Sequence, residues 1–121
     1  MRYMLMHKLD EAIPNAYDPT PEFVERMGGF VQEAMNAGVL LAAEGLRPTS
    51  EGASRITVSG GRKTVTDGPF IETKELIAGF AMIQVRSHDE AVEWARRFAD
   101  LFVGYIDDME IDVRRLAEQP A

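Results

Sequence analysis

The first residues of the chain alternate between two faces, as is typical of a β-strand. From Arg2 to Leu9 every second side chain falls on the same side, so one face carries Tyr3, Leu5, His7 and Leu9. A loop with three prolines follows, from Asp10 to Pro21. Apolar residues then recur at intervals of three and four, which predicts an amphipathic helix that starts at Thr20-Pro21-Glu22 and ends at Gly38.

The rest of the chain has the pattern of five more strands and one more helix. Gly60-Gly61 lies between two of the strands and is a two-residue hairpin turn signal. Ser87-His88-Asp89-Glu90 has the sequence of a capping box and opens the second helix. The predicted strands are Val39–Leu46, Ser54–Ser59, Arg62–Thr66, Leu76–Val85 and Met109–Arg114.

This order, βαβ, an inserted hairpin and a second βαβ, predicts a single α+β domain over residues 1–121. The fold class is ferredoxin-like, βαββαβ with an inserted β-hairpin. Both faces of Leu76–Val85 are apolar, yet two helices cover only one face of such a sheet. We therefore expect a symmetric homodimer with a closed or nearly closed barrel between the subunits. The alternative is an internal cover made by the Asp10–Pro21 loop and the hairpin.

Composition narrows the function classes. The 121 residues include no cysteine, which excludes disulfides, thiolate metal sites and cysteine nucleophiles. A net charge of −7 argues against direct nucleic-acid binding, because phosphates would repel the chain. The pattern predicts no signal peptide and no membrane span, so we expect a cytoplasmic protein. The two histidines, His7 and His88, lie in different environments, and we predict no metal and no cofactor.

The most informative stretch is Thr66–Glu75, which places charged side chains on a constrained backbone just before an apolar strand. Asp67-Gly68 is a turn former, and Gly68 precedes Pro69, which disfavours helix there. Phe70 would anchor this turn in apolar surroundings. The stretch is therefore the first candidate site.

If Phe70 to Lys74 is extended, Phe70, Glu72 and Lys74 lie on one side of the backbone. This places a carboxylate beside an ammonium group, a pair that binds polar ligands or serves as acid and base when burial shifts its pKa values. The alternative is architectural: Asp67 closes an Asx-turn, Phe70 joins the core, and Glu72 with Lys74 forms a solvated ion pair of little energetic weight.

The block Asp67-Gly68-Pro69-Phe70, followed by Glu72-Thr73-Lys74-Glu75 and Gly79-Phe80, resembles the signature of the DGPF group within the YCII-related family. The resemblance implies a dimeric α+β barrel with a cleft and a chemistry that is largely unassigned. It also implies a regulatory context, since members occur beside extracytoplasmic-function sigma factors. The chain departs from the pattern at Ile71 and at Ile77-Ala78, and the His–Asp pair of another branch cannot be mapped onto it.

Two further residues outside the motif are candidates. His7 lies on a strand face with apolar neighbours, where a histidine is either a neighbour of the core or a base or ligand. Glu44 sits among apolar residues, so an inward carboxylate would need a partner such as Arg47 or Arg55, although strand alternation can also turn it to solvent.

The resulting hypothesis is a small-molecule-binding protein with its cleft at the motif, with cofactor-independent acid–base catalysis as an extension of that role. Asp67 or His7 would be the base, and Phe70, Glu72, Lys74 and Glu44 would bind the ligand. The alternative is a non-enzymatic interaction module in transcriptional regulation, which predicts a flat exposed apolar patch in place of a concave cleft.

Overall fold

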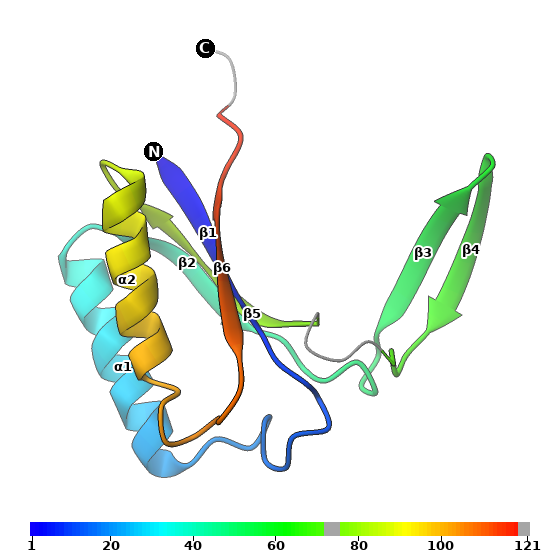
Figure 1. Cartoon of the computed structure of the whole chain (residues 1–121), viewed down its shortest axis with the longest axis horizontal. Coiled ribbons are helices and arrows are strands. Elements are labelled where there is room, and N and C mark those ends of the chain that lie inside the picture. Colours follow the sequence, from blue (N-terminus) through cyan, green and yellow to red (C-terminus); the bar gives the residue numbers. More distant parts are fainter. Residues whose placement is uncertain (72–75, 119–121) are drawn as a thin grey trace.

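The computed structural model describes residues 1–71 and 76–118, and all eight predicted elements are present (Figure 1). Their ends differ from the predicted ends by at most two residues. The helices are α1 (Pro21–Asn36) and α2 (His88–Asp100). The strands are β1 (Arg2–Lys8), β2 (Leu40–Gly45), β3 (Ser54–Ser59), β4 (Arg62–Asp67), β5 (Ile77–Gln84) and β6 (Glu110–Arg115).

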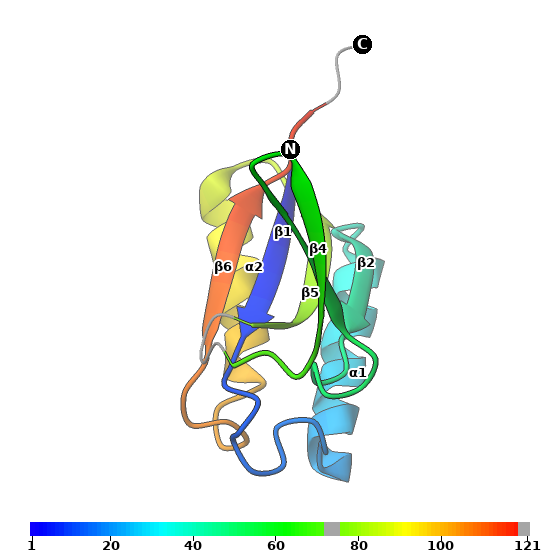
Figure 2. The same cartoon turned by 90° about the vertical axis from the view of Figure 1, so that its right-hand side faces the viewer.

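Four strands form one antiparallel sheet in the order β2-β5-β1-β6 (Figure 2). This order, with a helix after β1 and another after β5, confirms the ferredoxin-like α+β fold. The central pairs place Leu5 opposite Ala81 and His7 opposite Gly79. A register shift at the end of β1 and a second one in β2 locally break the ladders.

The helix ends follow the predicted capping signals. Thr20 Oγ1 accepts a hydrogen bond from the backbone N–H of Phe23 at 3.1 Å, and Gly38 takes a left-handed φ of +72° after α1. At α2, Ser87 Oγ accepts from the N–H of Glu90 at 3.1 Å, while the Glu90 carboxylate accepts from the N–H of Arg86. This is a capping box whose reciprocal bond is displaced by one residue.

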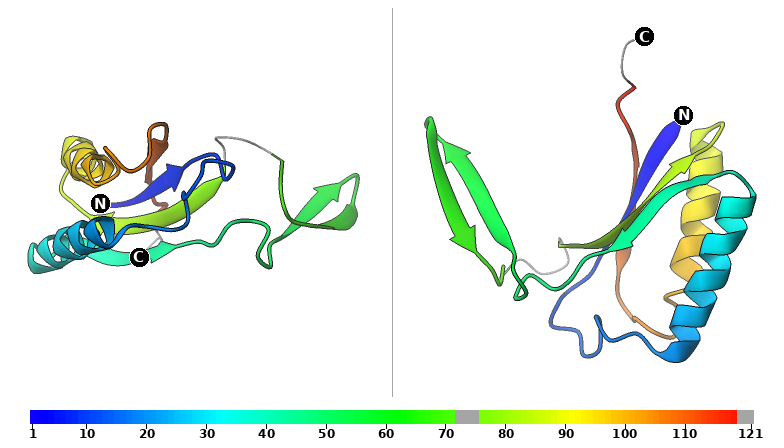
Figure 3. Two further views of the ribbon diagram at one scale, coloured as in Figure 1. Left: turned by 90° about the horizontal axis from the view of Figure 1, so that it is seen from below. Right: turned by 180° about the vertical axis from the view of Figure 1, so that it is seen from behind.

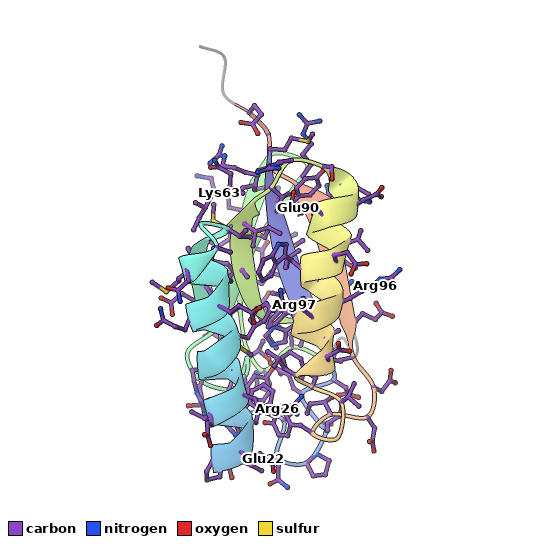
Figure 4. All side chains as sticks on the ribbon, turned by 90° about the vertical axis from the view of Figure 1, so that its left-hand side faces the viewer. Glu22, Arg26, Lys63, Glu90, Arg96 and Arg97 are labelled. Atoms are coloured by element: carbon purple, nitrogen blue, oxygen red, sulfur yellow. The ribbon has the colours of Figure 1, made fainter. Side chains whose placement is uncertain are left out.

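Both helices cover the same face of the sheet, and the core lies between these layers (Figures 1 and 4). Leu5 is the most deeply buried large side chain, with 1% of its surface exposed. Arg97, labelled in Figure 4, extends from α2 to an ion pair with Glu33 of α1 at 2.5 Å. Arg26 donates to the carbonyl oxygen of Asp100 at 3.0 Å, so two polar contacts join the helices.

The other face of the sheet carries no helix (Figure 1). It presents half-buried apolar side chains at its centre, where Met6 lies opposite Phe80 and Met4 opposite Met82. We call these four residues the open-face cluster. Beside it, Lys8 Nζ pairs with Asp112 of β6 at 2.8 Å.

Strands β3 and β4 form a separate two-stranded sheet that stands away from the main sheet on its open side (Figures 1 and 3). This confirms the inserted hairpin. Among the residues that the structure describes, no helix is long and apolar enough to cross a membrane. A cytoplasmic location remains a prediction.

Candidate functional site

A cavity of about 360 Å³ opens between α1, the sheet and the start of the loop after α2. It is lined mainly by apolar and aromatic side chains from elements far apart in sequence. Those most relevant to its chemistry are His7, Tyr17, Phe30, Glu44, Phe98 and Phe102. A concave, mainly apolar cavity with a few polar groups is the usual form of a small-molecule site.

His7 is the most unusual polar residue of this cavity. Strand alternation turns it toward the helices, where its ring centroid lies 5.0 Å from that of Phe102 and 5.7 Å from that of Phe98. The ring fits because its cross-strand partner is Gly79, where an added Cβ would overlap the imidazole. Because Gly79 has no side chain, the imidazole of His7 can lie over the backbone of the neighbouring strand β5.

The imidazole of His7 is enclosed without a polar partner. Its Nδ1 is buried and has no hydrogen bond within the described part of the chain. Burial lowers the pKa of His7 from 6.5 to about 4, because the aromatic surroundings disfavour the charged form. His7 is therefore neutral at physiological pH. His88 differs, because it lies exposed at the start of α2.

Glu44 lines the same cavity from β2, where it lies opposite Phe80. Its side chain is exposed, and it makes no ion pair or hydrogen bond within residues 1–71 and 76–118. Of the two arginines that the sequence offered as partners, Arg47 pairs with Glu51 at 2.8 Å. The guanidinium of Arg55 lies 4.1 Å from the ring centroid of Phe70.

The motif residues lie elsewhere, at the base of the hairpin. Asp67 ends β4, is exposed, and accepts a hydrogen bond from Ser54 Oγ at 2.9 Å. Phe70 is half-buried beneath Arg55. Neither Asp67 nor Phe70 lines the cavity of His7 and Glu44. Glu72 and Lys74 fall outside the described residues.

The backbone of the motif packs closely against the loop before β3. The peptide bond from Gly68 to Pro69 is cis, and the N–H of Gly68 donates to the carbonyl of Ala53 at 2.8 Å. A Cβ on Gly68 would overlap the carbonyl oxygen of Thr49. Glycine is thus required here by close backbone approach.

A hydrogen-bonded chain that sequence analysis missed joins the motif to the cavity. The N–H of Phe70 donates to Thr49 Oγ1 at 2.9 Å, and Thr49 donates from its own N–H and hydroxyl to the Glu11 carboxylate at 2.6 and 2.7 Å. The Tyr17 hydroxyl donates to the same carboxylate at 3.5 Å and lines the cavity.

Burial and the neighbouring Glu11 raise the pKa of Tyr17 to about 12, so its hydroxyl stays protonated. Glu11 lies 38 residues before Thr49, and no spacing in the sequence pointed to their contact.

Within the described residues, no group of three or more histidine, aspartate or glutamate side chains is placed to hold a metal ion. The site therefore offers aromatic surface, one neutral imidazole and an exposed carboxylate, together with the Tyr17 hydroxyl and an arginine, Arg47, that is paired with Glu51. Such a set can bind an uncharged ligand or one that bears a cation.

Comparison with known proteins gives two matches. A family model described as the YCII-related domain matches residues 1–113. An uncharacterized protein of Rhizobium meliloti (strain 1021), R00369, is 33% identical over 98 residues, which cover 79% of this chain and 78% of that protein.

Proposed function

Because this chain belongs to the YCII-related family, whose matched relative is itself uncharacterized, we propose its function from the site: it binds a small, mainly apolar molecule in the cavity beside His7. One observation carries the proposal. The imidazole of His7 is set into the wall of an apolar cavity, with its Nδ1 buried and unpartnered. A buried polar atom without a partner has a free-energy cost, which suits a functional role better than a packing role.

The ring also has a preferred tautomer. An N–H buried without an acceptor is rarer in proteins than a buried acceptor without a donor. The single proton of the neutral ring therefore belongs on Nε2, because Nδ1 is the nitrogen that is enclosed. His7 then offers one neutral N–H donor to the cavity, and the ligand should carry a hydrogen-bond acceptor such as a carbonyl.

Size and charge define the ligand further. A volume of about 360 Å³ is at the lower end of small-molecule sites, which suits a compact molecule. The aromatic walls favour a flat or branched apolar body. The cavity lining holds one carboxylate, Glu44, and one guanidinium, Arg47, which is already paired with Glu51. The unpaired carboxylate disfavours an anionic ligand.

Binding suits these residues better than acid–base catalysis. A histidine with a pKa near 4 is a weak base at neutral pH, since a good general base has a pKa close to the working pH. Asp67, the other candidate base, is exposed and lies outside the cavity lining. Any chemistry would be cofactor-independent and would use the Nε2–H of His7 to polarise the bound acceptor.

We also propose that the protein is a homodimer whose sheets face one another. The open-face cluster of Met4, Met6, Phe80 and Met82 supports this, because an apolar sheet face is normally covered. The cavity lies mainly on the helix side, and Phe80 of the open-face cluster also belongs to its lining. Ligand binding and pairing of the sheets would therefore use different surfaces that meet at Phe80.

A fragment screen by two-dimensional NMR tests the function, with neutral and cationic compounds on the wild type, His7→Leu and His88→Leu. The chain contains only these two histidines, which makes His88→Leu a matched control. We expect fragments that shift the amide signals around Phe102 and Ala43 and bind His88→Leu like wild type. They should bind His7→Leu about tenfold more weakly, because leucine has no N–H donor and one buried hydrogen bond is lost. Fragments that bind only at residues 66–71, or equally to both variants, would refute the proposal.

A further inference from the structure

The β3–β4 hairpin is strongly amphipathic. Cross-strand pairing places Ile56 opposite Val65 and Val58 opposite Lys63, so the centre of one face is apolar, with Lys63 toward the turn and the bonded pair of Ser54 and Asp67 at the base. We call it the apolar face. The reverse face pairs Thr57 with Thr64 and carries polar side chains throughout. Ile56, Val58 and Val65 are 67%, 70% and 64% exposed, so residues 1–71 and 76–118 do not cover the apolar face. A face of this kind is typical of a contact surface.

The hairpin also lacks the support that such elements need. It stands away from the body of the molecule in two orthogonal directions of view (Figures 1 and 3). A two-stranded hairpin by itself is marginally stable in water and requires packing against another element. The main sheet does not pair with the hairpin, and within the described residues no other element packs on its apolar face, which leaves this face available to another molecule.

Charge points to a second copy of this chain as that molecule. Residues 54–67 hold Arg55, Arg62 and Lys63 with Asp67 as the one acidic residue, a local charge of +2 in a chain of −7. The other residues of the chain therefore sum to a charge of −9. A basic arm is therefore attracted to the acidic body of its own kind.

We propose that the hairpin is an exchange arm: its apolar face packs on the open-face side of a second copy, and its basic residues are attracted to the net negative charge of that copy. The arm projects on the same side of the sheet as the open-face cluster (Figure 1), so a copy placed there meets both surfaces. Each subunit gives one arm and receives one, which satisfies two-fold symmetry. The homodimer proposed above requires only that the two sheets face one another, whereas the exchange arm adds a second contact between the subunits.

Sedimentation equilibrium over a range of concentrations tests the arm, with Val58→Asp compared with Thr57→Asp. These neighbours on β3 point to opposite faces of the hairpin, so the two variants share the same charge change and the same cost in strand propensity. We expect a wild-type mass of about twice 13.5 kDa. The dissociation constant should rise at least about tenfold for Val58→Asp, the loss of one buried valine, and change less than about twofold for Thr57→Asp.

Hydrogen exchange on the wild type gives a second measurement that requires no variant. Backbone amides of residues 54–67 should exchange more slowly at concentrations where the dimer forms than at high dilution. The arm is refuted if Val58→Asp dimerises like wild type, if both variants weaken the dimer equally, or if hairpin exchange is independent of concentration. A wild type that stays monomeric refutes it too. A stable dimer whose hairpin amides exchange rapidly would also refute the arm, and it would indicate that the apolar face binds a different protein.

Discussion

The buried, neutral state of His7 makes the stability of the protein depend on pH in a specific way. In the unfolded chain this histidine titrates near 6.5, whereas burial holds its pKa at about 4 in the folded chain. Between these values the unfolded state binds a proton that the folded state does not. The free energy of unfolding therefore falls as the pH falls through this window, and His7 has no effect above about pH 7.

The magnitude follows from the two pKa values. At about 1.4 kcal/mol for each pH unit between 6.5 and about 4, the loss of stability from His7 reaches about 3 kcal/mol at pH 4. His7→Leu replaces the imidazole with an apolar side chain that cannot titrate, and it also removes the unpartnered Nδ1. The difference in unfolding free energy between variant and wild type should thus grow by about 3 kcal/mol from neutral pH to pH 4.

Urea denaturation at a fixed protein concentration provides the assay. Trp94 is the single tryptophan of the chain and lies half-buried beside Arg97, so its fluorescence reports on the packing of α2. Carboxylates titrate in both proteins and cancel in the difference. His88→Gln should follow the wild type below pH 5, because it leaves His7 in place. If the free energy of unfolding depends on pH in the same way for wild type and His7→Leu, His7 is not a buried neutral imidazole.

Three more substitutions have defined outcomes. Gly28→Ala lies on an exposed helical surface with no atom near the added methyl, so thermal denaturation should show a gain of about 1 kcal/mol; a loss would reveal a contact at this surface. Thr49→Val removes the hydroxyl that donates to the Glu11 carboxylate and accepts from the N–H of Phe70, and it leaves the backbone N–H bond to Glu11 in place. The loss of these two hydrogen bonds should cost about 2 kcal/mol in urea unfolding, whereas Ser50→Ala should cost almost nothing; equal effects would remove Thr49 from its linking role. Glu44→Gln should weaken cationic fragments about fivefold in NMR titrations and leave neutral ones unchanged, and an equal effect on both classes would exclude a charge role for Glu44.

The fold was predictable because its signals are local. Alternation in Arg2–Lys8, the proline at the start of α1, Gly60-Gly61 and the Ser87 capping box each specify a nearby backbone conformation. Sheet order followed from the order of elements, since few topologies satisfy βαβ connections twice. The hairpin was predicted as an element, but its separation from the sheet depends on packing that local patterns do not encode.

The site was less accessible to prediction because it depends on contacts between distant segments. His7 was identified as a candidate from its strand face, but its neutral state depends on Phe98 and Phe102, more than 90 residues later. The motif drew attention to Asp67, whose bond to Ser54 holds the base of a hairpin. No periodicity linked Glu11 to Thr49, because these residues lie in two loops that are brought together by the tertiary structure.

The most direct test of the central claim is a long-range proton–nitrogen NMR spectrum of the His7 ring at neutral pH, recorded without and with a bound fragment. We expect a neutral ring with the proton on Nε2, and a shift of the Nε2 signal when the fragment binds. His88 serves as the internal reference and should not move. A charged imidazolium, or a proton on Nδ1 with no response to any fragment, would contradict a ligand site built around His7.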